Sequence, residues 1–262
     1  MLAAPAIGVC SGQRFVNGGS GKMYRFLNIF LLIIISTASC TRSDRQSDGD
    51  RAGYTFGEVL FFDDFSGDLS NWLVEGRQPE IIDGRMNLDT PVGTTVWLKP
   101  WLQGNVMIEY NVTVIDGGGP NDRVSDLNCF WMATDPCHPG DLFAAGEQRD
   151  GVFAEYGNLN LYYVGYGGNA NTTTRFRRYN NGSRELLGEY TDAPHLIMPN
   201  HQYHIQLICC GNIVEYWRDG ERLFRYEDPE PYNRGHFGLR TVQNHLKMDN
   251  FRVVHLHPAQ QE

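Results

Sequence analysis

The chain has 262 residues, 41% hydrophobic and 20% charged, a composition that excludes a disordered chain and a coiled coil. Residues 53–262 carry 16 basic and 28 acidic side chains, so this body lacks the basic surface that a nucleic-acid backbone requires. The length does not require two domains, because all-β sandwiches of more than about 200 residues often form one unit.

The first predicted element is an export signal that begins at Met23. A short basic start leads into an apolar run over residues 26–35, and small residues follow it. The run is shorter than a membrane-spanning helix, so residues 23–40 are interpreted as a signal peptide. Because this signal is complete from Met23 onward, we interpret residues 1–22 as a gene-model extension.

The signal ends on a candidate lipidation site at Cys40. The small residues directly before this cysteine resemble a bacterial lipobox, which implies a lipidated, periplasmic or outer-membrane-anchored protein of the cell envelope. An ordinary signal peptide cut nearby is the alternative. Residues 41–52 contain no large apolar side chain and are predicted to form a flexible tether. A single domain is expected over residues 53–257, followed by a tail at 258–262.

From Tyr54 onward the sequence alternates between apolar and polar residues in short segments bounded by Gly, Asn, Asp and Pro, which predicts an all-β antiparallel sandwich. The Asp219-Gly220 pair suits a type I′ hairpin turn. The predicted strands are 58–63, 80–89, 94–99, 104–115, 124–134, 151–156, 159–166, 173–180, 201–209, 212–218, 221–226, 235–241 and 247–256.

Four cysteines fall within the predicted domain, and an exported protein permits disulfides. Cys129 and Cys137 are close enough in sequence to close a short loop. The neighbours Cys209 and Cys210 point to opposite faces of a strand, so a bridge between them would be strained. Zinc is disfavoured at these cysteines, because no paired C-x-x-C or His spacing accompanies them.

Three segments carry a family resemblance: LFFDDFSGDLSNWLVEG, YWRDGERLFRY and GHFGLRTVQNHLKMDNFRVVHL. Their order resembles the concanavalin-A-like lectin/glucanase jelly rolls. The middle of the chain, DRVSDLNCFWMATDP and LYYVGYGGNANTTTRFRRY, resembles uncharacterised exported YesU-type proteins of polysaccharide-degrading bacteria. The resemblance covers about residues 54–256 and implies a single jelly-roll domain that acts on a glycan such as rhamnogalacturonan.

The segment VSDLNCFWMAT provides the first candidate site residues. Strand alternation places Asp126, Asn128 and Phe130 on one face, a combination suited to sugar hydroxyls and to the apolar face of a sugar. Leu127, Cys129 and Trp131 lie on the other, apolar face, which we expect to face the core. The alternative is that the polar set is merely the solvated side of a sheet.

The next two segments add tyrosines and arginines. Tyr162 and Tyr166 share one face of their predicted strand. Arg175 and Arg177 align on one face of the following strand, and guanidinium groups bind carboxylates bidentately, which suits a uronic acid. Pairing with the protein's own acids is the alternative. Asn169, in a predicted glycine-rich turn, and Arg240 complete the candidate substrate-binding residues.

The sequence leaves the reaction open. A glycosidase needs two carboxylates about 5–10 Å apart, and the pair Asp126 and Glu155 is the candidate. A polysaccharide lyase needs an arginine to neutralise the uronate and a Tyr or His to transfer the adjacent proton. The groups available for elimination are Arg175 or Arg177 together with Tyr163, Tyr166 or His245. The glutamate motif of retaining β-glucanases and the motifs of alginate lyases with this fold are absent.

We therefore expect an exported lipoprotein that hydrolyses or eliminates a polysaccharide containing uronic acid or rhamnose. A non-catalytic glycan-binding module is the main alternative, and a structural envelope lipoprotein is a third. The expected partner is an oligo- or polysaccharide, with membrane contact only through the lipid anchor. No cofactor and no metal site are expected. Whether a structural calcium ion is bound is not determined by the sequence.

Overall fold

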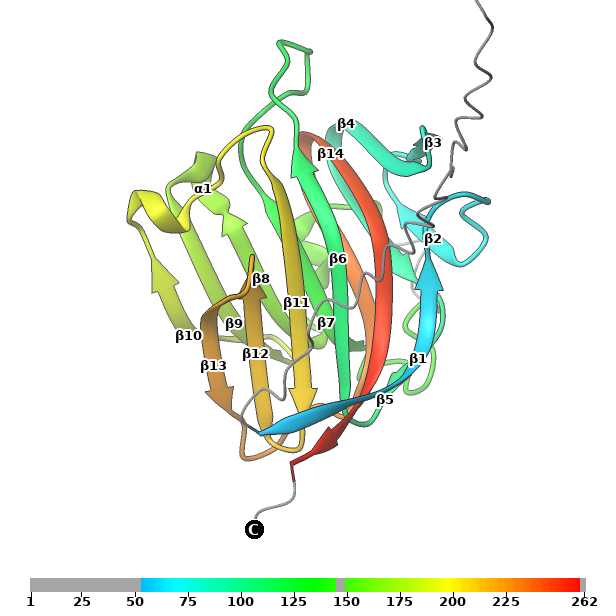
Figure 1. Ribbon diagram of the computed structural model, residues 1–262, viewed down its shortest axis with the longest axis vertical. Coiled ribbons are helices and arrows are strands. Elements are labelled where there is room, and N and C mark those ends of the chain that lie inside the picture. The colour runs from blue at the N-terminus through cyan, green and yellow to red at the C-terminus, as the bar shows by residue number, and fades with distance from the viewer. Residues whose placement is uncertain (1–52, 145–148, 260–262) are drawn as a thin grey trace, which may run out of the picture. The chain divides into compact units, whose positions relative to one another are not determined.

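Antiparallel strands build nearly the whole of the domain in this computed structural model, which describes residues 53–144 and 149–259 (Figure 1). These residues belong to the second of two units into which the chain divides, Gln46–Glu262. The predicted signal peptide, the tether and Cys40 lie outside the described residues. Within the described ranges, no helix has the length and apolar character needed to cross a membrane.

The strands follow one another with short connections. In chain order they are β1 (Tyr54–Asp63), β2 (Trp72–Glu75), β3 (Glu80–Ile82), β4 (Arg85–Leu98), β5 (Leu102–Gln103), β6 (Val106–Val114), β7 (Leu127–Thr134), β8 (Asn160–Gly167), β9 (Thr173–Asn180), β10 (Ser183–Tyr190), β11 (Gln202–Cys210), β12 (Ile213–Arg218), β13 (Glu221–Glu227) and β14 (Arg234–Pro258). The helical pieces are single turns: η2 (Phe153–Tyr156), α1 (Gly168–Asn171) and η3 (Ala193–His195).

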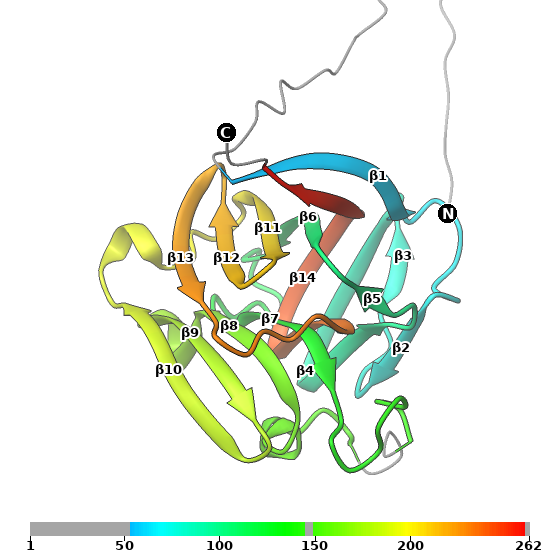
Figure 2. The same cartoon turned by 90° about the horizontal axis from the view of Figure 1, so that it is seen from below.

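The long strand β14 joins two antiparallel layers (Figure 2). Its first part pairs with β7 and β4, in a first sheet that continues through β8, β9 and β10. Its last part pairs with β1 and β6, in a second sheet that continues through β11, β12 and β13. The predicted all-β antiparallel sandwich is confirmed.

The main core lies between the two layers. Trp131 and Phe176 stack on the inner face of the first sheet with ring centroids 5.7 Å apart, and Phe176 meets Phe224 of β13 at 5.6 Å. Leu127 and Cys129 belong to the same cluster, which confirms the predicted core face of β7. Because side chains alternate along a strand, the other face of β7 is turned away from this core.

Several predicted strands differ from the observed ones. Residues 151–156 do not form a strand, since 153–156 make the single turn η2. The strand β10 was not predicted, because it is a largely exposed edge with few apolar residues. The two last predicted strands form one continuous β14. An irregularity between Val242 and Asn244, with positive φ at Gln243, interrupts the alternation on which the prediction rested.

The predicted hairpin turn is confirmed, because Asp219 and Gly220 both have positive φ, as a type I′ turn requires. The four cysteines within the described residues are free. Cys129 is buried in the core whereas Cys137 is exposed, so the loop closure considered for them is not formed. Cys209 and Cys210 do point to opposite faces, into two different apolar clusters.

Candidate functional site

A cavity of about 550 Å³ lies on the outer face of the first sheet, a volume typical of ligand pockets. We call it the arginine pocket. Its walls come from β4, β8, β9, β10, β14, the turn α1, the start of β7, and the start of η2 with the two residues before it. The lining residues are Gly93, Asp126, Asn128, Gly151, Val152, Phe153, Tyr163, Gly165, Gly168, Asn169, Thr173, Arg175, Arg177, Tyr179, Arg184, Arg240 and Val242.

The floor of the arginine pocket is one row of residues that runs across five strands. Arg240 of β14 lies opposite Asn128 of β7, which lies opposite Gly165 of β8. The row continues through Arg175 of β9 to Glu189 of β10. Directly opposed residues share a face of a sheet, so this pairing gathers side chains that are far apart in the sequence.

Gly165 keeps the middle of this row open. A Cβ atom at this position would come within 2.4 Å of the Tyr163 hydroxyl oxygen. Tyr163 itself lies opposite Arg177 in the neighbouring row. The glycine therefore leaves room for the Tyr163 hydroxyl beside the floor of the pocket.

The segment from Gly151 to Phe153 forms one wall and is fastened to the sheet. The backbones of Gly93 and Gly151 approach so closely that a Cβ atom on either would lie within 2.2 Å of the other's carbonyl oxygen. Arg240 donates from Nη2 to the carbonyl oxygen of Gly151 at 3.1 Å. Its guanidinium carbon also lies 4.6 Å from the centre of the Phe153 ring, a cation–π contact.

The pocket is strongly cationic, because its lining holds four arginines and one carboxylate, Asp126. Asp126 is already paired with Arg123, and Arg175 is paired with Glu189. Within residues 53–144 and 149–259, no carboxylate forms an ion pair with Arg177 or Arg240. The net positive charge of the cavity is therefore not neutralised by the described part of the protein.

Arg240 is the most deeply buried of the four lining arginines, because only 3% of its surface is exposed. Burial lowers its pKa, although the guanidinium stays charged at neutral pH. Its Nε and the carbonyl oxygen of the Asn128 side chain are buried without a hydrogen-bond partner among the described residues. Such unpaired groups are costly in a protein interior, and here they belong to two residues that line a cavity.

Two tyrosine hydroxyl groups, of Tyr163 and Tyr179, belong to the lining of the arginine pocket. Burial raises the pKa of the Tyr163 hydroxyl, while Arg240 and Arg177 act in the opposite direction. Burial likewise raises the pKa of Tyr179, against the influence of Arg184, Arg177 and Arg240. Both hydroxyls are therefore protonated at neutral pH and available as hydrogen-bond donors.

Six of the residues chosen from the sequence come together in the arginine pocket. Asp126, Asn128, Asn169, Arg175, Arg177 and Arg240 all line it. Asn169 lies in the tight turn α1, where it and the two residues after it have positive φ. The arginine alignment on β9 follows the predicted alternation, since Phe176 between them enters the core.

The placement of three aromatic residues corrects the sequence interpretation. Tyr162 and Tyr166 lie on the inner face of β8, in the main core. The Tyr162 hydroxyl donates to Asp228 at 2.6 Å. Phe130 is on the predicted outer face but is fully buried under the segment that covers this end of the sheet, stacked on Trp97. None of these three side chains is therefore accessible to a ligand in this structure.

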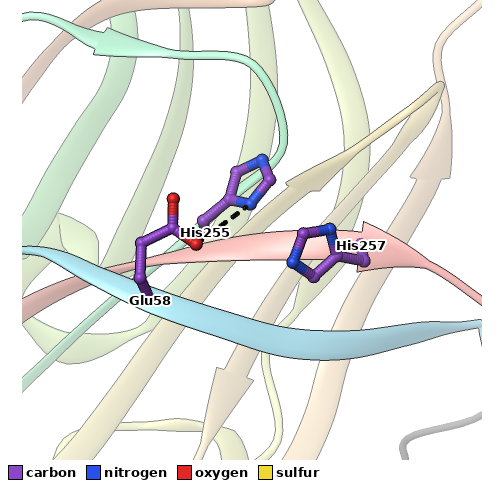
Figure 3. Close-up of side chains that lie close together, drawn as sticks. All are labelled: Glu58, His255 and His257. Atoms are coloured by element: carbon purple, nitrogen blue, oxygen red, sulfur yellow. Dashed lines mark ion pairs between the residues drawn. The ribbon is translucent and has the colours of Figure 1, made fainter.

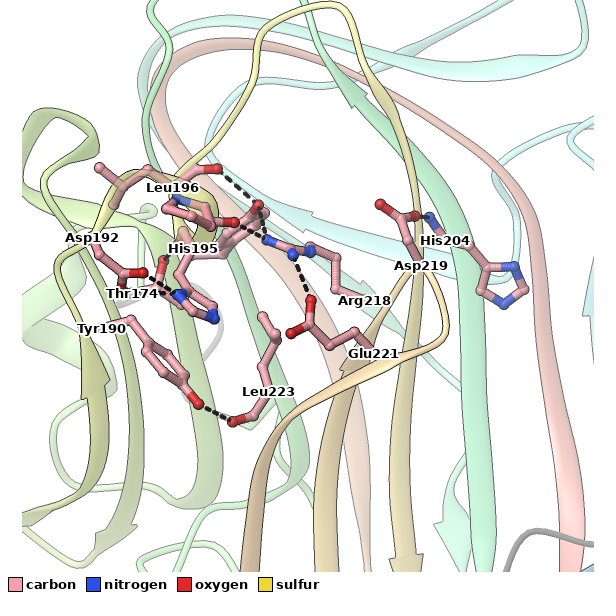
Figure 4. A network of polar contacts seen from close by, with 12 residues as sticks. Thr174, Tyr190, Asp192, His195, Leu196, His204, Arg218, Asp219, Glu221 and Leu223 are labelled. Atoms are coloured by element: carbon pink, nitrogen blue, oxygen red, sulfur yellow. Dashed lines mark hydrogen bonds and ion pairs between the residues drawn. The ribbon is translucent and has the colours of Figure 1, made fainter.

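The Tyr166 hydroxyl is also committed to internal contacts. It donates to the carbonyl oxygen of Leu196 at 3.0 Å and accepts from Nη1 of Arg218 at the same distance. Figure 4 shows this arginine extending from β12 between Leu196 and Glu221. The network links β12 to the connection before β11. None of these residues lines the arginine pocket.

Glu155 and His245 do not line the arginine pocket either. Glu155 is exposed on η2, where its carboxylate accepts from the backbone N–H of Asp150 at 3.1 Å. His245 contacts Asp122 and Asn87 through its two ring nitrogens, at 3.0 and 2.9 Å. Neither side chain is placed to act on a ligand held by Arg240.

Several lining residues are not among those that the sequence predicts. Tyr163 is predicted only for proton transfer, and Tyr179, Arg184 and Phe153 are not predicted. Alternation alone could not choose between the faces of β8, because both carry tyrosine. The register that places Tyr163 opposite Arg177 would have identified it. No sequence signal identifies Arg184, which comes from the unpredicted strand β10.

Comparison with solved structures shows the same fold in several proteins. A protein of unknown function with a galectin-like fold from Bacillus subtilis matches with a TM-score of 0.65 at 17% identity, covering 78% of this chain and 98% of that one. An endo-β-1,3-glucanase from Pyrococcus furiosus matches with a TM-score of 0.53 at 9% identity, covering 77% and 95%. The exoplasmic/lumenal domain of VIP36, bound to Ca²⁺ and Man3GlcNAc, matches with a TM-score of 0.52 at 13% identity, covering 78% and 93%.

These matches confirm the resemblance to concanavalin-A-like jelly rolls, and at such identities they show the fold alone. No curated protein matches the chain. The family model described as "Domain of unknown function (DUF6250)" matches residues 88–251, a range that includes the whole lining of the arginine pocket.

Proposed function

We propose that this chain, which belongs to the DUF6250 family, binds a glycan in its arginine pocket, with a sugar carboxylate held by Arg240 and Arg177. The observation that carries the proposal is Arg240, a buried guanidinium with no carboxylate partner among the described residues. A planar carboxylate matches the donor geometry of a guanidinium and would compensate its burial.

The rest of the lining suits a sugar. Phe153 offers aromatic surface, and the amides of Asn128 and Asn169 offer both donors and acceptors for hydroxyl groups. Proteins of similar fold include a glucanase and a domain solved with Man3GlcNAc, which supports a carbohydrate as the class of ligand. A uronic acid combines the two requirements, because it is a sugar that carries a carboxylate.

Hydrolysis is not the reaction that this geometry favours. A glycosidase uses two carboxylic groups about 5–10 Å apart on either side of the bond. Among the described lining residues Asp126 is the single carboxylate, and it is already paired with Arg123. Glu155, its intended partner, lies outside the pocket. Binding is therefore the primary proposal.

Elimination is the second candidate function, favoured by Tyr163, which lies opposite Arg177 and within the electrostatic influence of Arg240. In this reaction the proton next to the carboxylate is removed, and the bond from the adjacent carbon to the glycosidic oxygen breaks to leave a double bond. The arginines would stabilise the carbanion-like state, and the protonated Tyr163 would give its proton to the leaving oxygen. Asp126, the one carboxylate among the described lining residues, would accept the first proton.

The proposal also includes the cell envelope as the location. A lipid on Cys40, followed by a tether, would hold the domain at a membrane surface, where an exported glycan binder would meet extracellular polysaccharide. Mass spectrometry of membrane-extracted protein tests the lipid directly: a diacylglyceryl modification of Cys40 is expected, and an unmodified Cys40 contradicts this part.

Calorimetry with matched polymers tests the binding proposal. Polygalacturonate and rhamnogalacturonan should bind, whereas the same polymers with their carboxylates reduced to alcohols should not. Equal affinity for the acidic and the reduced polymer would contradict carboxylate recognition. The same samples, followed by ultraviolet absorbance of unsaturated uronate products, separate elimination from binding alone.

A further inference from the structure

Three side chains that are good metal ligands meet where β1 crosses the end of β14 (Figure 3). They are Glu58 of β1 and His255 and His257 of β14, and one ligand atom from each lies within 4.8 Å of the other two. The group belongs to the second sheet, and none of its members lines the arginine pocket.

An irregularity in β1 creates this cluster. His255 and His257 are two residues apart on a strand and therefore share a face. Phe56 pairs with Leu256 and Val59 pairs with Val254, so two residues of β1, Gly57 and Glu58, stand opposite the single residue His255. A β-bulge of this kind redirects side chains, and here it brings the Glu58 carboxylate to the histidine face.

Gly57 makes room for the second histidine. A Cβ atom at position 57 would lie 2.7 Å from Nε2 of His257 and 3.1 Å from the carbonyl oxygen of His255. Any larger residue would therefore displace the His257 ring from its position over β1. The two imidazole rings stand nearly perpendicular, with centroids 4.5 Å apart.

The ligand atoms are not satisfied by one another. Nδ1 of His255 is buried and has no hydrogen-bond partner among the described residues. Its distance to the Glu58 carboxylate, 3.8 Å, is too long for a hydrogen bond. Within the described ranges, Glu58 forms no other ion pair. Two nitrogens and one oxygen thus lie within 4.8 Å of one another.

We propose that Glu58, His255 and His257 bind one divalent transition-metal ion, with Zn²⁺ as the best-suited ion. Zinc accepts imidazole nitrogen and carboxylate oxygen at about 2.0–2.2 Å, so small rotations of exposed side chains would close the cluster around it. Calcium and magnesium prefer ligand sets made of oxygen only. Three protein ligands leave a fourth tetrahedral position for water.

The bound ion would fasten the first strand of the domain to the last. Glu58 comes from β1, and the histidines come from the last residues of β14. The ion would therefore cross-link the first and last strands of the described fold. An ion that binds the folded state alone raises the ratio of folded to unfolded protein about a hundredfold at a concentration 100 times its dissociation constant.

Zinc titration of the full chain, made without a histidine tag and stripped with chelator, tests the proposal. Calorimetry should give one site, and Co²⁺ should show the absorption of a tetrahedral ion. His257→Ala and Glu58→Gln alter exposed side chains and should each weaken zinc binding by more than about tenfold, since even outer groups of metal sites matter by 10–100-fold. Zinc should also raise the melting temperature of the wild type and not of His257→Ala.

His201→Ala is the control, because His201 is a half-buried histidine outside the cluster that contacts Asp219 and the Tyr203 ring. It should bind zinc with the affinity of the wild type. The proposal is overturned if the wild type binds no zinc in this titration. It is equally overturned if His257→Ala keeps the wild-type affinity, since the ion would then occupy another site, such as one that includes the exposed Cys137.

Discussion

Arg240 and Asn128 lie directly opposite each other on β14 and β7, and each keeps a buried polar atom without a hydrogen-bond partner among the described residues. The two residues are 3% and 1% exposed. A buried donor or acceptor left unpaired costs about 1–3 kcal/mol, so the pair is arranged for something other than stability alone.

Arg177→Ala should weaken the binding of an acidic glycan while leaving the melting temperature unchanged. Arg177 lines the pocket and forms no ion pair within the described domain. Its charge should therefore contribute to ligand binding rather than to the stability of the fold. A charge-assisted bond is worth about 1.5–3 kcal/mol, or roughly ten- to a hundredfold in affinity. Arg177→Lys should recover little, because an ammonium group lacks the planar fork.

Calorimetry and a melting curve on the same samples measure both effects of Arg177→Ala. Arg85→Ala is the control, because Arg85 is a half-exposed arginine paired with Asp249 away from the pocket. Unchanged affinity in Arg177→Ala for every acidic glycan that the wild type binds would rule out its role.

The neighbours Tyr162 and Tyr163 should give opposite results when each is replaced by phenylalanine. Tyr162→Phe removes a buried bond to the charged Asp228 and should lower the free energy of unfolding by about 1.5–3 kcal/mol, with affinity unchanged. Tyr163→Phe should weaken glycan binding at little cost in stability, because its hydroxyl faces the pocket. Denaturant titration and calorimetry test the pair, and a loss of affinity in Tyr162→Phe alone would reverse the assignment.

Gly165→Ala should close the floor of the arginine pocket. The new Cβ atom would meet the Tyr163 hydroxyl at 2.4 Å, and the buried ring must move. Overpacking of this kind costs about 1–3 kcal/mol, and glycan binding should fall with it. Gly67→Ala, at a position where a Cβ atom meets nothing within 4 Å, is the control and should change neither quantity. Full affinity in Gly165→Ala would show that the ligand does not use the floor.

Glu109 should make the domain sensitive to acid. Burial favours its neutral form, but hydrogen bonds from His204 and Gln206 and the charge of Arg252 lower its pKa from 4.5 to about 2. A carboxylate with a lowered pKa contributes stability that is present above its unfolded pKa and lost as the pH falls toward its folded pKa. The shift corresponds to about 3 kcal/mol, lost between about pH 4.5 and pH 2.

Denaturant unfolding as a function of pH measures this contribution of Glu109. Glu109→Gln should be less stable than the wild type at neutral pH, and its stability should fall less steeply in the acid window. Equal slopes for the two proteins between pH 4.5 and pH 2 would contradict the assignment to this residue.

The class of fold was predictable from the residue pattern alone. Alternation along a strand is a local property, so segments such as VSDLNCFWMAT revealed both a strand and its apolar face before any partner strand was known. The Asp219-Gly220 turn was equally local, since it depends on the φ angles of two residues. The alignment of Arg175 with Arg177 on an outer face followed from the same rule.

Which side chains share a site depends on how the strands pair in space. The row from Arg240 through Asn128 and Gly165 depends on the register between strands distant in sequence, which periodicity within one strand cannot supply. β8 has tyrosines on both faces, so its pattern did not favour Tyr163 over Tyr162. The segment before β8 buried Phe130 and left Arg240 at the pocket floor, because long-range packing determines which part of a sheet face is covered.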